Sequence, residues 1–220
     1  MRFKCVIFDL DGTLVDTIED IAASMNRALE VHGFPPAPLE GYPKIVGWGI
    51  KKLAYLALPP AAREGEAGET IAAAVAADAS RFYAERPLVY SKPYPGIPEL
   101  LAALRGKGVK TAVLTNKPDP VARLVTAGLF PPGSFGAVYG ERPGVPRKPD
   151  PASVRNLLRE LDCIPGETLF MGDSEIDIET AHGGECHALG VSWGFRPRQV
   201  LEKAGADRII DRPEELLELI

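Results

Sequence analysis

The sequence predicts an α/β fold: a doubly wound parallel sheet that carries an inserted all-helical domain. Two observations predict it. From about residue 97 onward, short apolar runs alternate with amphipathic segments at helical spacing, which is typical of a parallel sheet with helices on both faces. Between residues 15 and 88, in contrast, the sequence has helical patterns and no convincing strand. Because an apolar run precedes this stretch, we expect the first strand of the sheet to come before the insertion.

The first half of the chain contains that strand and the predicted helices of the insertion. The strand covers residues 4–8, where four apolar residues follow a lysine. A helix is expected over 17–33, because apolar residues recur there at helical spacing and a glycine provides the stop. After several prolines, the stretches YPKIVGWGIKKLAYLAL and ETIAAAVAADASRFYAE are also expected to be helical.

In the second half, strands and helices alternate, and glycines and prolines separate them. This order predicts a Rossmann-like core domain formed by residues 1–14 and 92–220, and a helical domain formed by residues 15–91. The predicted helices cover 97–106, 119–127, 151–161, 175–182, 197–204 and 213–219, and the predicted strands cover 109–116, about 135–139, 167–171, 187–191 and 208–210.

The composition narrows the class of protein. The chain has 220 residues, of which 45% are hydrophobic and 25% charged, and its formal net charge is −5. This charge gives no reason to expect a nucleic-acid partner. No stretch approaches the ~20 apolar residues of a membrane span, and the first residues do not form a secretion signal. The odd number of cysteines, three, fits reduced thiols. We therefore expect a cytoplasmic protein without a membrane partner.

The first predicted strand ends in two closely spaced acids, Asp9 and Asp11, in the segment VIFDLDGTLVDT. Two like charges ~4 Å apart repel by roughly 4 kcal/mol at an effective dielectric constant of about 20. Such repulsion is tolerable where a cation lies between the acids, or where one of them holds a proton. Both explanations point to a chemical role.

Further polar side chains follow the later strands. Thr115 and Asn116 end the strand in VLTNK, and Lys148 lies in the next loop, PRKPDP. Asp173 and Asp177 occur in FMGDSEIDIE. Taken singly, each residue fits a turn or a helix cap. Ligands of parallel sheets bind beyond the carboxyl ends of the strands, so the four strand ends together predict one shared site.

These residue types suit a magnesium-assisted phosphoryl transfer. Mg²⁺ prefers oxygen ligands and is usually held by one or two carboxylates, which Asp9 and Asp173 can supply. A carboxylate can also attack phosphorus and form an aspartyl-phosphate. Asp11 could then give a proton to the leaving oxygen and afterwards activate water. The groups available to hold the phosphoryl oxygens are the Thr115 hydroxyl, the Lys148 ammonium and the backbone N–H groups near Gly12 and Asn116.

Four segments, DLDGTLVDT, LTNK, KPDP and GDSEIDIETA, resemble the four motifs of the haloacid dehalogenase (HAD) superfamily of phosphohydrolases. The helical insertion looks like the helical cap domain of one of its subfamilies. The C-terminal segment GVSWGFRPRQVLEKAGADRIIDRPEELLELI and the cap segment VGWGIKKLAYLAL resemble the phosphoglycolate phosphatase branch, which often has a polar residue where Trp48 stands. The dehalogenases themselves lack an acid at the position of Asp11.

The resemblance implies roles for the matching residues. Asp9 would be the nucleophile, and Asp11 the general acid and base. Thr115 and Lys148 would bind phosphate, and Lys148 would also restrain Asp9. The implied magnesium ligands are Asp9, the backbone carbonyl of Asp11 and Asp173, with Asp177 in support.

We therefore expect a Mg²⁺-dependent phosphatase that hydrolyses a small phosphorylated metabolite, 2-phosphoglycolate first, through an aspartyl-phosphate. The alternatives are a sugar-phosphate mutase of the β-phosphoglucomutase type, a pyrophosphatase and, from another class, a non-catalytic phosphate-binding protein. In the cap, Trp48 either contacts the substrate or packs within the helices, and Lys51 and Lys52 either meet a substrate carboxylate or face solvent. The sequence leaves monomer and homodimer open.

Overall fold

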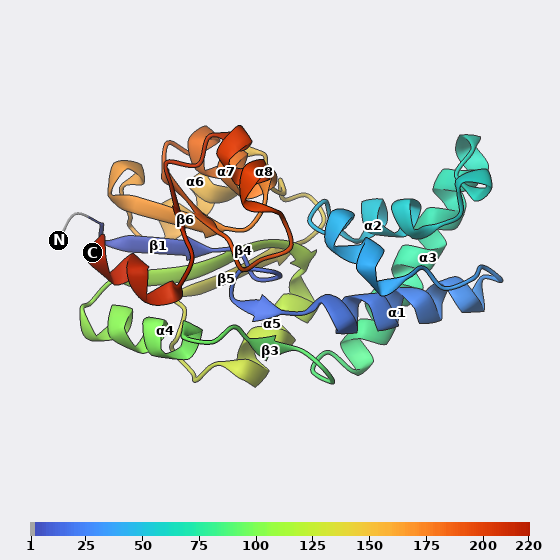
Figure 1. Cartoon of the computed structure of the whole chain (residues 1–220), viewed down its shortest axis with the longest axis horizontal. Helices are drawn as coiled ribbons and strands as arrows, with labels where there is room; N and C mark the ends of the chain where they lie inside the picture. Colours follow the sequence, from blue (N-terminus) through green and yellow to red (C-terminus); the bar gives the residue numbers. More distant parts are fainter. Residues whose placement is uncertain (1–2) are drawn as a thin grey trace.

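The structure is a computed structural model that describes residues 3–220. Six parallel strands form its central sheet: β1 (Cys5–Phe8), β4 (Lys110–Pro118), β5 (Ala137–Glu141), β6 (Thr168–Gly172), β7 (His187–Val191) and β8 (Arg208–Ile210). The strand order is β5-β4-β1-β6-β7-β8, so the chain winds outward from β1 in both directions (Figure 1). This confirms the predicted doubly wound α/β fold.

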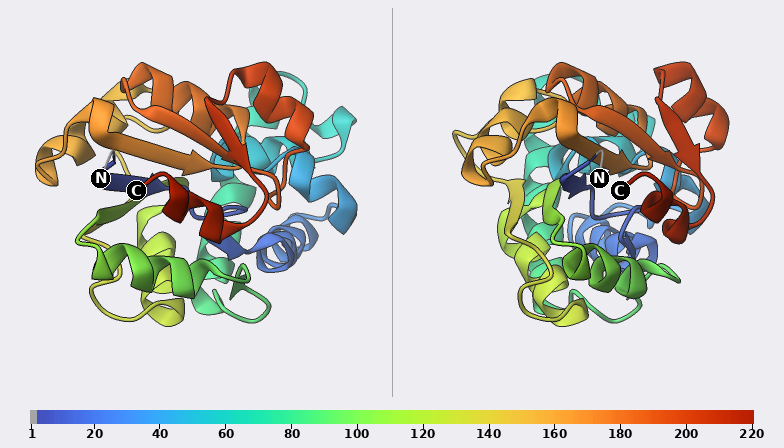
Figure 2. Two further views of the ribbon diagram at one scale, coloured as in Figure 1. Left: turned by 60° about the vertical axis from the view of Figure 1, so that its left-hand side comes forward. Right: turned by 90° about the vertical axis from the view of Figure 1, so that its left-hand side faces the viewer.

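Helices cover both faces of this sheet (Figures 1 and 2). Successive side chains of a strand point to opposite faces, and β1 shows this directly. Val6 and Phe8 belong to the apolar cluster that includes α4 and α5, whereas Ile7 belongs to the cluster that includes α6, α7 and α8. The bounds of these helices are α4 (Ile97–Gly106), α5 (Asp119–Leu129), α6 (Pro151–Glu160), α7 (Glu175–Gly183) and α8 (Arg198–Ala204).

The parallel register brings the strand ends to one edge of the sheet. Phe8, the last residue of β1, pairs with Val113 of β4 on one side and with Met171 of β6 on the other. The next residue, Asp9, donates its backbone N–H to the Met171 carbonyl at 2.9 Å. The residues that follow Phe8, Val113 and Met171 therefore meet at the same edge of the sheet.

The helical insertion lies beyond this edge, on the right in Figure 1. Its α1 and α2 both pack on α3 through small and apolar side chains, among them Met25, Leu53 and Val75, which are buried. The buried apolar residues of the insertion belong to the same apolar cluster as one face of the sheet. Its elements are α1 (Ile18–Val31), α2 (Ile50–Ala57) and α3 (Gly65–Glu85), with 3₁₀ turns η1 (Leu39–Lys44) and η2 (Pro60–Ala62).

Three expectations for the secondary structure are wrong. Residues 15–88 do contain a strand, because β2 (Val15–Asp16) pairs antiparallel with β3 (Lys92–Pro93) where the chain enters and leaves the insertion. A two-residue ladder is too short to produce an alternating pattern. YPKIVGW is not helical throughout: Pro43 lies inside η1, and two glycines with positive φ precede α2. The last predicted helix is a 3₁₀ helix, η4 (Pro213–Glu218).

The other predicted elements are present within a few residues of their expected bounds. The division into domains at 14/15 and 91/92 stays a prediction. Within residues 3–220, none of the helices combines the length and hydropathy that a membrane crossing requires.

Candidate active site

Three buried carboxylates meet beyond the carboxyl edge of the sheet. Asp9 follows β1, Asp173 follows β6, and Asp177 lies in the first turn of α7. Each offers an oxygen within 4.8 Å of the others, and all three residues are at most 7% exposed. Such a concentration of negative charge away from water requires cations near it.

Lys148 provides one of these cations. Its Nζ lies 2.8 Å from Asp9 Oδ1 and 2.6 Å from Asp177 Oδ1, and its side chain is only 2% exposed. Burial lowers the pKa of Lys148, but the charges of Asp177 and Asp9 outweigh burial and hold that pKa above its ordinary value. Lys148 is therefore a permanent cation that links the two acids.

One ammonium does not balance three acids. Burial raises the pKa of Asp9 to about 6, and the charges of Asp177 and Asp11 add to this effect while Lys148 opposes it. Burial, followed by the charges of Asp177 and Asp9, also raises the pKa of Asp173 well above its ordinary value. Both directions mean that the protein alone leaves this cluster short of positive charge.

The donor set fits a hard divalent cation such as Mg²⁺. Asp177 is already engaged: Oδ1 accepts from Lys148, and Oδ2 accepts from Ser174 N at 3.0 Å and Ser174 Oγ at 2.6 Å in a capping box for α7. Asp9 and Asp173 accept from fewer donors: Asp173 accepts from Thr13 Oγ1 at 3.3 Å and from Phe195 N at 2.7 Å. Asp9 Oδ1 accepts from Lys148 and from Leu10 N, and none of the residues 3–220 donates to Asp9 Oδ2. Asp9 and Asp173 are therefore the better candidate ligands.

Gly12 provides room for Asp173. Its φ of +84° lies in the left-handed region, and a Cβ at this position would lie 2.4 Å from Asp173 Oδ2. The Gly12 N–H donates to the Val15 carbonyl at 2.9 Å. In this structure Gly12 shapes the turn and the space for Asp173, whereas the sequence suggested phosphate contact through backbone N–H groups near it.

Thr115 and Asn116 end up near the acids but in different settings. Thr115 is 4% exposed and lines the cavity. The Asn116 side chain donates to the Gly47 carbonyl at 2.9 Å and to the Lys148 carbonyl at 3.0 Å, and it accepts from Lys148 N. Asn116 therefore ties the loop before α2 to the loop that carries Lys148.

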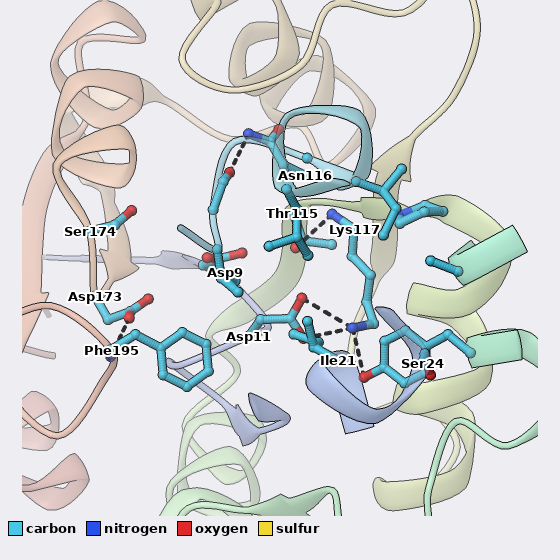
Figure 3. A pocket seen from close by; sticks show the side chains of 18 of the residues that line it. Asp9, Asp11, Ile21, Ser24, Thr115, Asn116, Lys117, Asp173, Ser174 and Phe195 are labelled. Carbon is cyan, nitrogen blue, oxygen red and sulfur yellow. Dashed lines mark hydrogen bonds and ion pairs between the residues drawn. The ribbon is translucent and has the colours of Figure 1, made fainter. Parts of the chain in front are cut away.

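Asp11 has a different environment from Asp9. Its Oδ1 accepts from Thr17 Oγ1 at 2.8 Å and from Lys117 Nζ at 2.9 Å, and its Oδ2 lies 3.1 Å from the same Nζ. Figure 3 shows these contacts between Asp11 and Lys117. Lys117 Nζ also donates to the hydroxyl of Tyr83 at 2.8 Å. The two acids of the first motif thus pair with two different lysines.

Sequence reasoning missed Lys117, Tyr83 and Arg196. Lys117 follows the predicted Thr115 and Asn116, so its place at a strand end was the available signal. Arg196 comes from the loop after β7 and donates to the carbonyls of Val46, at 2.7 Å, and Pro43. It also pairs with Glu175 at 3.3 Å. The loop before α2 is thereby held against the core by Arg196 and Asn116.

A cavity of about 60 Å³ lies between these residues and the helical insertion. Gly47 and Gly49 line it, but Trp48 between them does not and is 36% exposed. Lys51 and Lys52 are exposed on α2, which agrees with a solvated helix face. The core supplies Asp9, Asp11, Thr115, Asn116, Lys117, Asp173 and Arg196 to the lining, and the insertion supplies Ile21, Ser24, Val46, Ile50, Leu53, Ala79 and Tyr83.

Comparison with known proteins shows the family to which this chain belongs. The family of haloacid dehalogenase-like hydrolases matches residues 6–191, which include the whole central sheet except Cys5 and β8. The chain belongs to this family. A phosphoglycolate phosphatase of Aquifex aeolicus is 31% identical over 217 residues, which cover 99% of this chain and 96% of the relative. An N-acetylmuramic acid 6-phosphate phosphatase of Pseudomonas aeruginosa is also 31% identical, covering 100% and 96% of the two chains.

A solved structure supports the same family assignment. The crystal structure of a candidate phosphoglycolate phosphatase from Lactobacillus delbrueckii subsp. bulgaricus matches with a TM-score of 0.90 and 33% identity, over 100% of this chain and 99% of that chain. The predicted resemblance to this superfamily and to its phosphoglycolate phosphatase branch is confirmed. This haloacid dehalogenase-like hydrolase is an enzyme of the phosphatase type.

Proposed function

We propose that this hydrolase is a Mg²⁺-dependent phosphatase that acts on a small phosphorylated metabolite through an aspartyl-phosphate on Asp9. The observation that carries the proposal is the separation of the two acids. Asp9 pairs with Lys148 and offers an oxygen within 4.8 Å of one from Asp173, and no residue among 3–220 donates to its Oδ2, whereas Asp11 is held apart by Thr17 and Lys117. One acid is therefore placed to react and the other to move a proton.

Asp9, Asp173 and the backbone carbonyl of Asp11 are the residues that would hold Mg²⁺, with Asp177 supporting them through Lys148 and Ser174. When bound, the ion would supply positive charge to the acidic cluster and to the phosphoryl oxygens. That the ion is Mg²⁺ is part of the proposal. The fit rests on oxygen donors, burial and the shortage of positive charge described above.

The chain's own residues account for the transfer. An oxygen of Asp9 attacks phosphorus, the bond from phosphorus to the ester oxygen breaks, and Asp11 gives its proton to that oxygen. Asp11, then ionised, takes a proton from a water that attacks the same phosphorus, and Asp9 is released as the carboxylate. Thr115 and Lys148 stabilise the charge on the phosphoryl oxygens. Lys148 also fixes Asp9 through its contact at 2.8 Å.

Among substrates, we propose 2-phosphoglycolate first. The names of the Aquifex relative and of the Lactobacillus structure support it. So does the lining: Ile21, Val46, Ile50 and Leu53 give a largely apolar surface on the cap side, which offers few partners for the hydroxyls of a sugar. The mutase and pyrophosphatase alternatives stay open, as does an N-acetylmuramic acid 6-phosphate-like substrate. Location in the cytoplasm and the choice between monomer and homodimer remain predictions.

Phosphate release from a substrate panel tests the proposal. The panel contains 2-phosphoglycolate, β-glucose 1-phosphate, pyrophosphate and several sugar phosphates, each with Mg²⁺ and with EDTA. We expect release only with Mg²⁺, the highest kcat/KM for 2-phosphoglycolate, and none from Asp9→Asn. Equal rates in EDTA would contradict the metal dependence. Absence of release from every ester would contradict the enzymatic function and favour a phosphate-binding protein.

A further inference from the structure

We propose that Lys117 binds the carboxylate of the substrate's leaving group, and that it makes this phosphatase selective for phosphate esters that carry an acid next to the ester carbon. This inference rests on the proposed function, because it assumes that Asp11 serves the leaving oxygen. It assigns a substrate contact to Lys117, a residue to which the sequence motifs assigned no role.

The first step concerns where a substrate carboxylate must lie. A general acid has to come within hydrogen-bond reach of the oxygen that it protonates. In a 2-phosphoester of a hydroxy acid, that oxygen is separated from the carboxyl carbon by a single methylene or methine carbon. With Asp11 at the leaving oxygen, the substrate carboxylate lies beside the Asp11 carboxyl group. Once Asp11 has given its proton to the leaving oxygen, two ionised acids lie side by side in a buried site and need a cation between them.

The second step asks which cation is available. Among the described residues that line the cavity, two are cationic, Lys117 and Arg196. The guanidinium of Arg196 is committed to the carbonyls of Pro43 and Val46 and to Glu175. Lys117 Nζ lies 2.9 Å from Asp11 Oδ1, in a side chain that is 3% exposed. Lys117 is therefore the cation at the required place.

The third step concerns how one N–H donor of the Lys117 ammonium becomes available to the substrate. Asp11 Oδ1 is held twice, by Thr17 and by Lys117, while among the described residues Lys117 alone holds Oδ2, at 3.1 Å. When Oδ2 turns to the leaving oxygen, the N–H that it occupied becomes free for the substrate carboxylate. The contact to Oδ1 is kept, so Asp11 stays oriented during the exchange.

The helical insertion places the ammonium. The Tyr83 hydroxyl, from α3, accepts from Lys117 Nζ at 2.8 Å, and the ammonium lies 4.0 Å from the centre of the Tyr83 ring. Tyr83 is 4% exposed. The recognition of the carboxylate therefore depends on a residue of the insertion as well as on β4.

The test compares 2-phosphoglycolate with 2-phosphoglycolamide, in which a neutral amide replaces the carboxylate. We expect wild type to prefer the acid in kcat/KM by about tenfold to a hundredfold, the range for a hydrogen bond to a charged group. Lys117→Met should abolish most of this preference. Lys117→Arg, which keeps a cation, should retain part of it, and Tyr83→Phe should reduce it. Lys51→Met, on the exposed face of α2, is the matched control and should keep the wild-type ratio.

The ratio of kcat/KM for 2-phosphoglycolate to kcat/KM for 2-phosphoglycolamide separates recognition of the carboxylate from a purely structural role of Lys117. If Lys117 only positions Asp11, Lys117→Met lowers kcat/KM for the acid and the amide by the same factor, and the proposal is overturned. A wild-type enzyme that hydrolyses both esters equally well also overturns it. Competitive inhibition by inorganic phosphate should be unchanged in Lys117→Met, which shows that the variant is folded and keeps its phosphate site. An enzyme that hydrolyses neither ester contradicts the proposed function instead.

Discussion

Replacing Lys148 by methionine should destabilise the protein strongly, because it leaves buried acids without their cation. Lys148 Nζ lies 2.8 Å from Asp9 and 2.6 Å from Asp177, and all three side chains are at most 10% exposed. At an effective dielectric constant of about 20, each contact is worth roughly 6 kcal/mol before desolvation is subtracted. Removing one partner of a buried ion pair costs about 3–5 kcal/mol net.

This loss is large compared with the stability of a typical domain, about 5–15 kcal/mol. For a chain of this size, each kcal/mol corresponds to roughly 2–4 °C in Tm, so the melting temperature should fall by about 6–20 °C in EDTA. The matched control is Lys4→Met. Lys4 lies 2.8 Å from Glu167, but its side chain is 63% exposed, and such a pair contributes less than about 1 kcal/mol.

The pH dependence gives an independent check. A carboxyl group whose pKa is higher in the folded state takes up protons on folding, so its contribution to stability falls as pH rises through that interval. Burial raises the pKa of Asp9 to about 6 in wild type, and the charge of Lys148 opposes this. Without Lys148 the pKa of Asp9 rises further, so the deficit of the variant should shrink as pH falls from 7 toward 5. The pKa of Lys148 is raised from an already high ordinary value, so its own charge is constant over this range.

Thermal or denaturant unfolding at several pH values, with both variants in EDTA, measures these effects. Addition of Mg²⁺ should restore part of the stability of Lys148→Met, because it supplies charge to the same cluster. A stability within 1 kcal/mol of wild type at pH 7, or a deficit that grows at lower pH, would refute the electrostatic account of Lys148.

Other substitutions test separate parts of the site. Gly12→Ala places a Cβ 2.4 Å from Asp173 Oδ2, so calorimetric titration should show Mg²⁺ affinity reduced by about tenfold to a hundredfold; an unchanged Kd would exclude Asp173 as a ligand. Asp11→Asn should lower kcat by about 10²–10⁴-fold while Mg²⁺ still binds, and a normal rate would rule out its role in proton transfer. Arg196→Gln removes the guanidinium contacts to the loop before α2, so amide hydrogen exchange of residues 44–47 should become faster and KM should rise. The same exchange rate in both proteins would argue against this restraint.

The core of the site could be predicted from the sequence because parallel strands share their carboxyl ends. Asp9 and Asp173 each follow a strand, and Thr115 lies near the carboxyl end of β4. Recognising the strands was therefore enough to expect these residues in one place, and the structure places them there. The pairing of Lys148 with Asp9 was implied by family resemblance and has the expected geometry, at 2.8 Å. The roles of these residues remain proposals.

Contacts across the interface with the helical insertion could not be predicted in this way. Lys117 meets Tyr83 across 34 positions of sequence, and Arg196 meets Val46 across 150. Neither contact follows from a local pattern, because each depends on how the helices are placed over the sheet. The same limit applies to Trp48, which is adjacent to two cavity-lining glycines but does not itself line the cavity. The short β2–β3 ladder was missed because two residues carry no periodicity.

The central claim is that Asp9 becomes phosphorylated, and chemical trapping of the intermediate tests it most directly. The enzyme would be mixed with 2-phosphoglycolate and Mg²⁺, quenched in acid within one turnover and reduced with borohydride, which converts an aspartyl-phosphate to homoserine. We predict homoserine at position 9 and at no other acid, and none in EDTA or in Asp9→Asn. Phosphate release without modification of Asp9, or homoserine at position 11, would contradict the account.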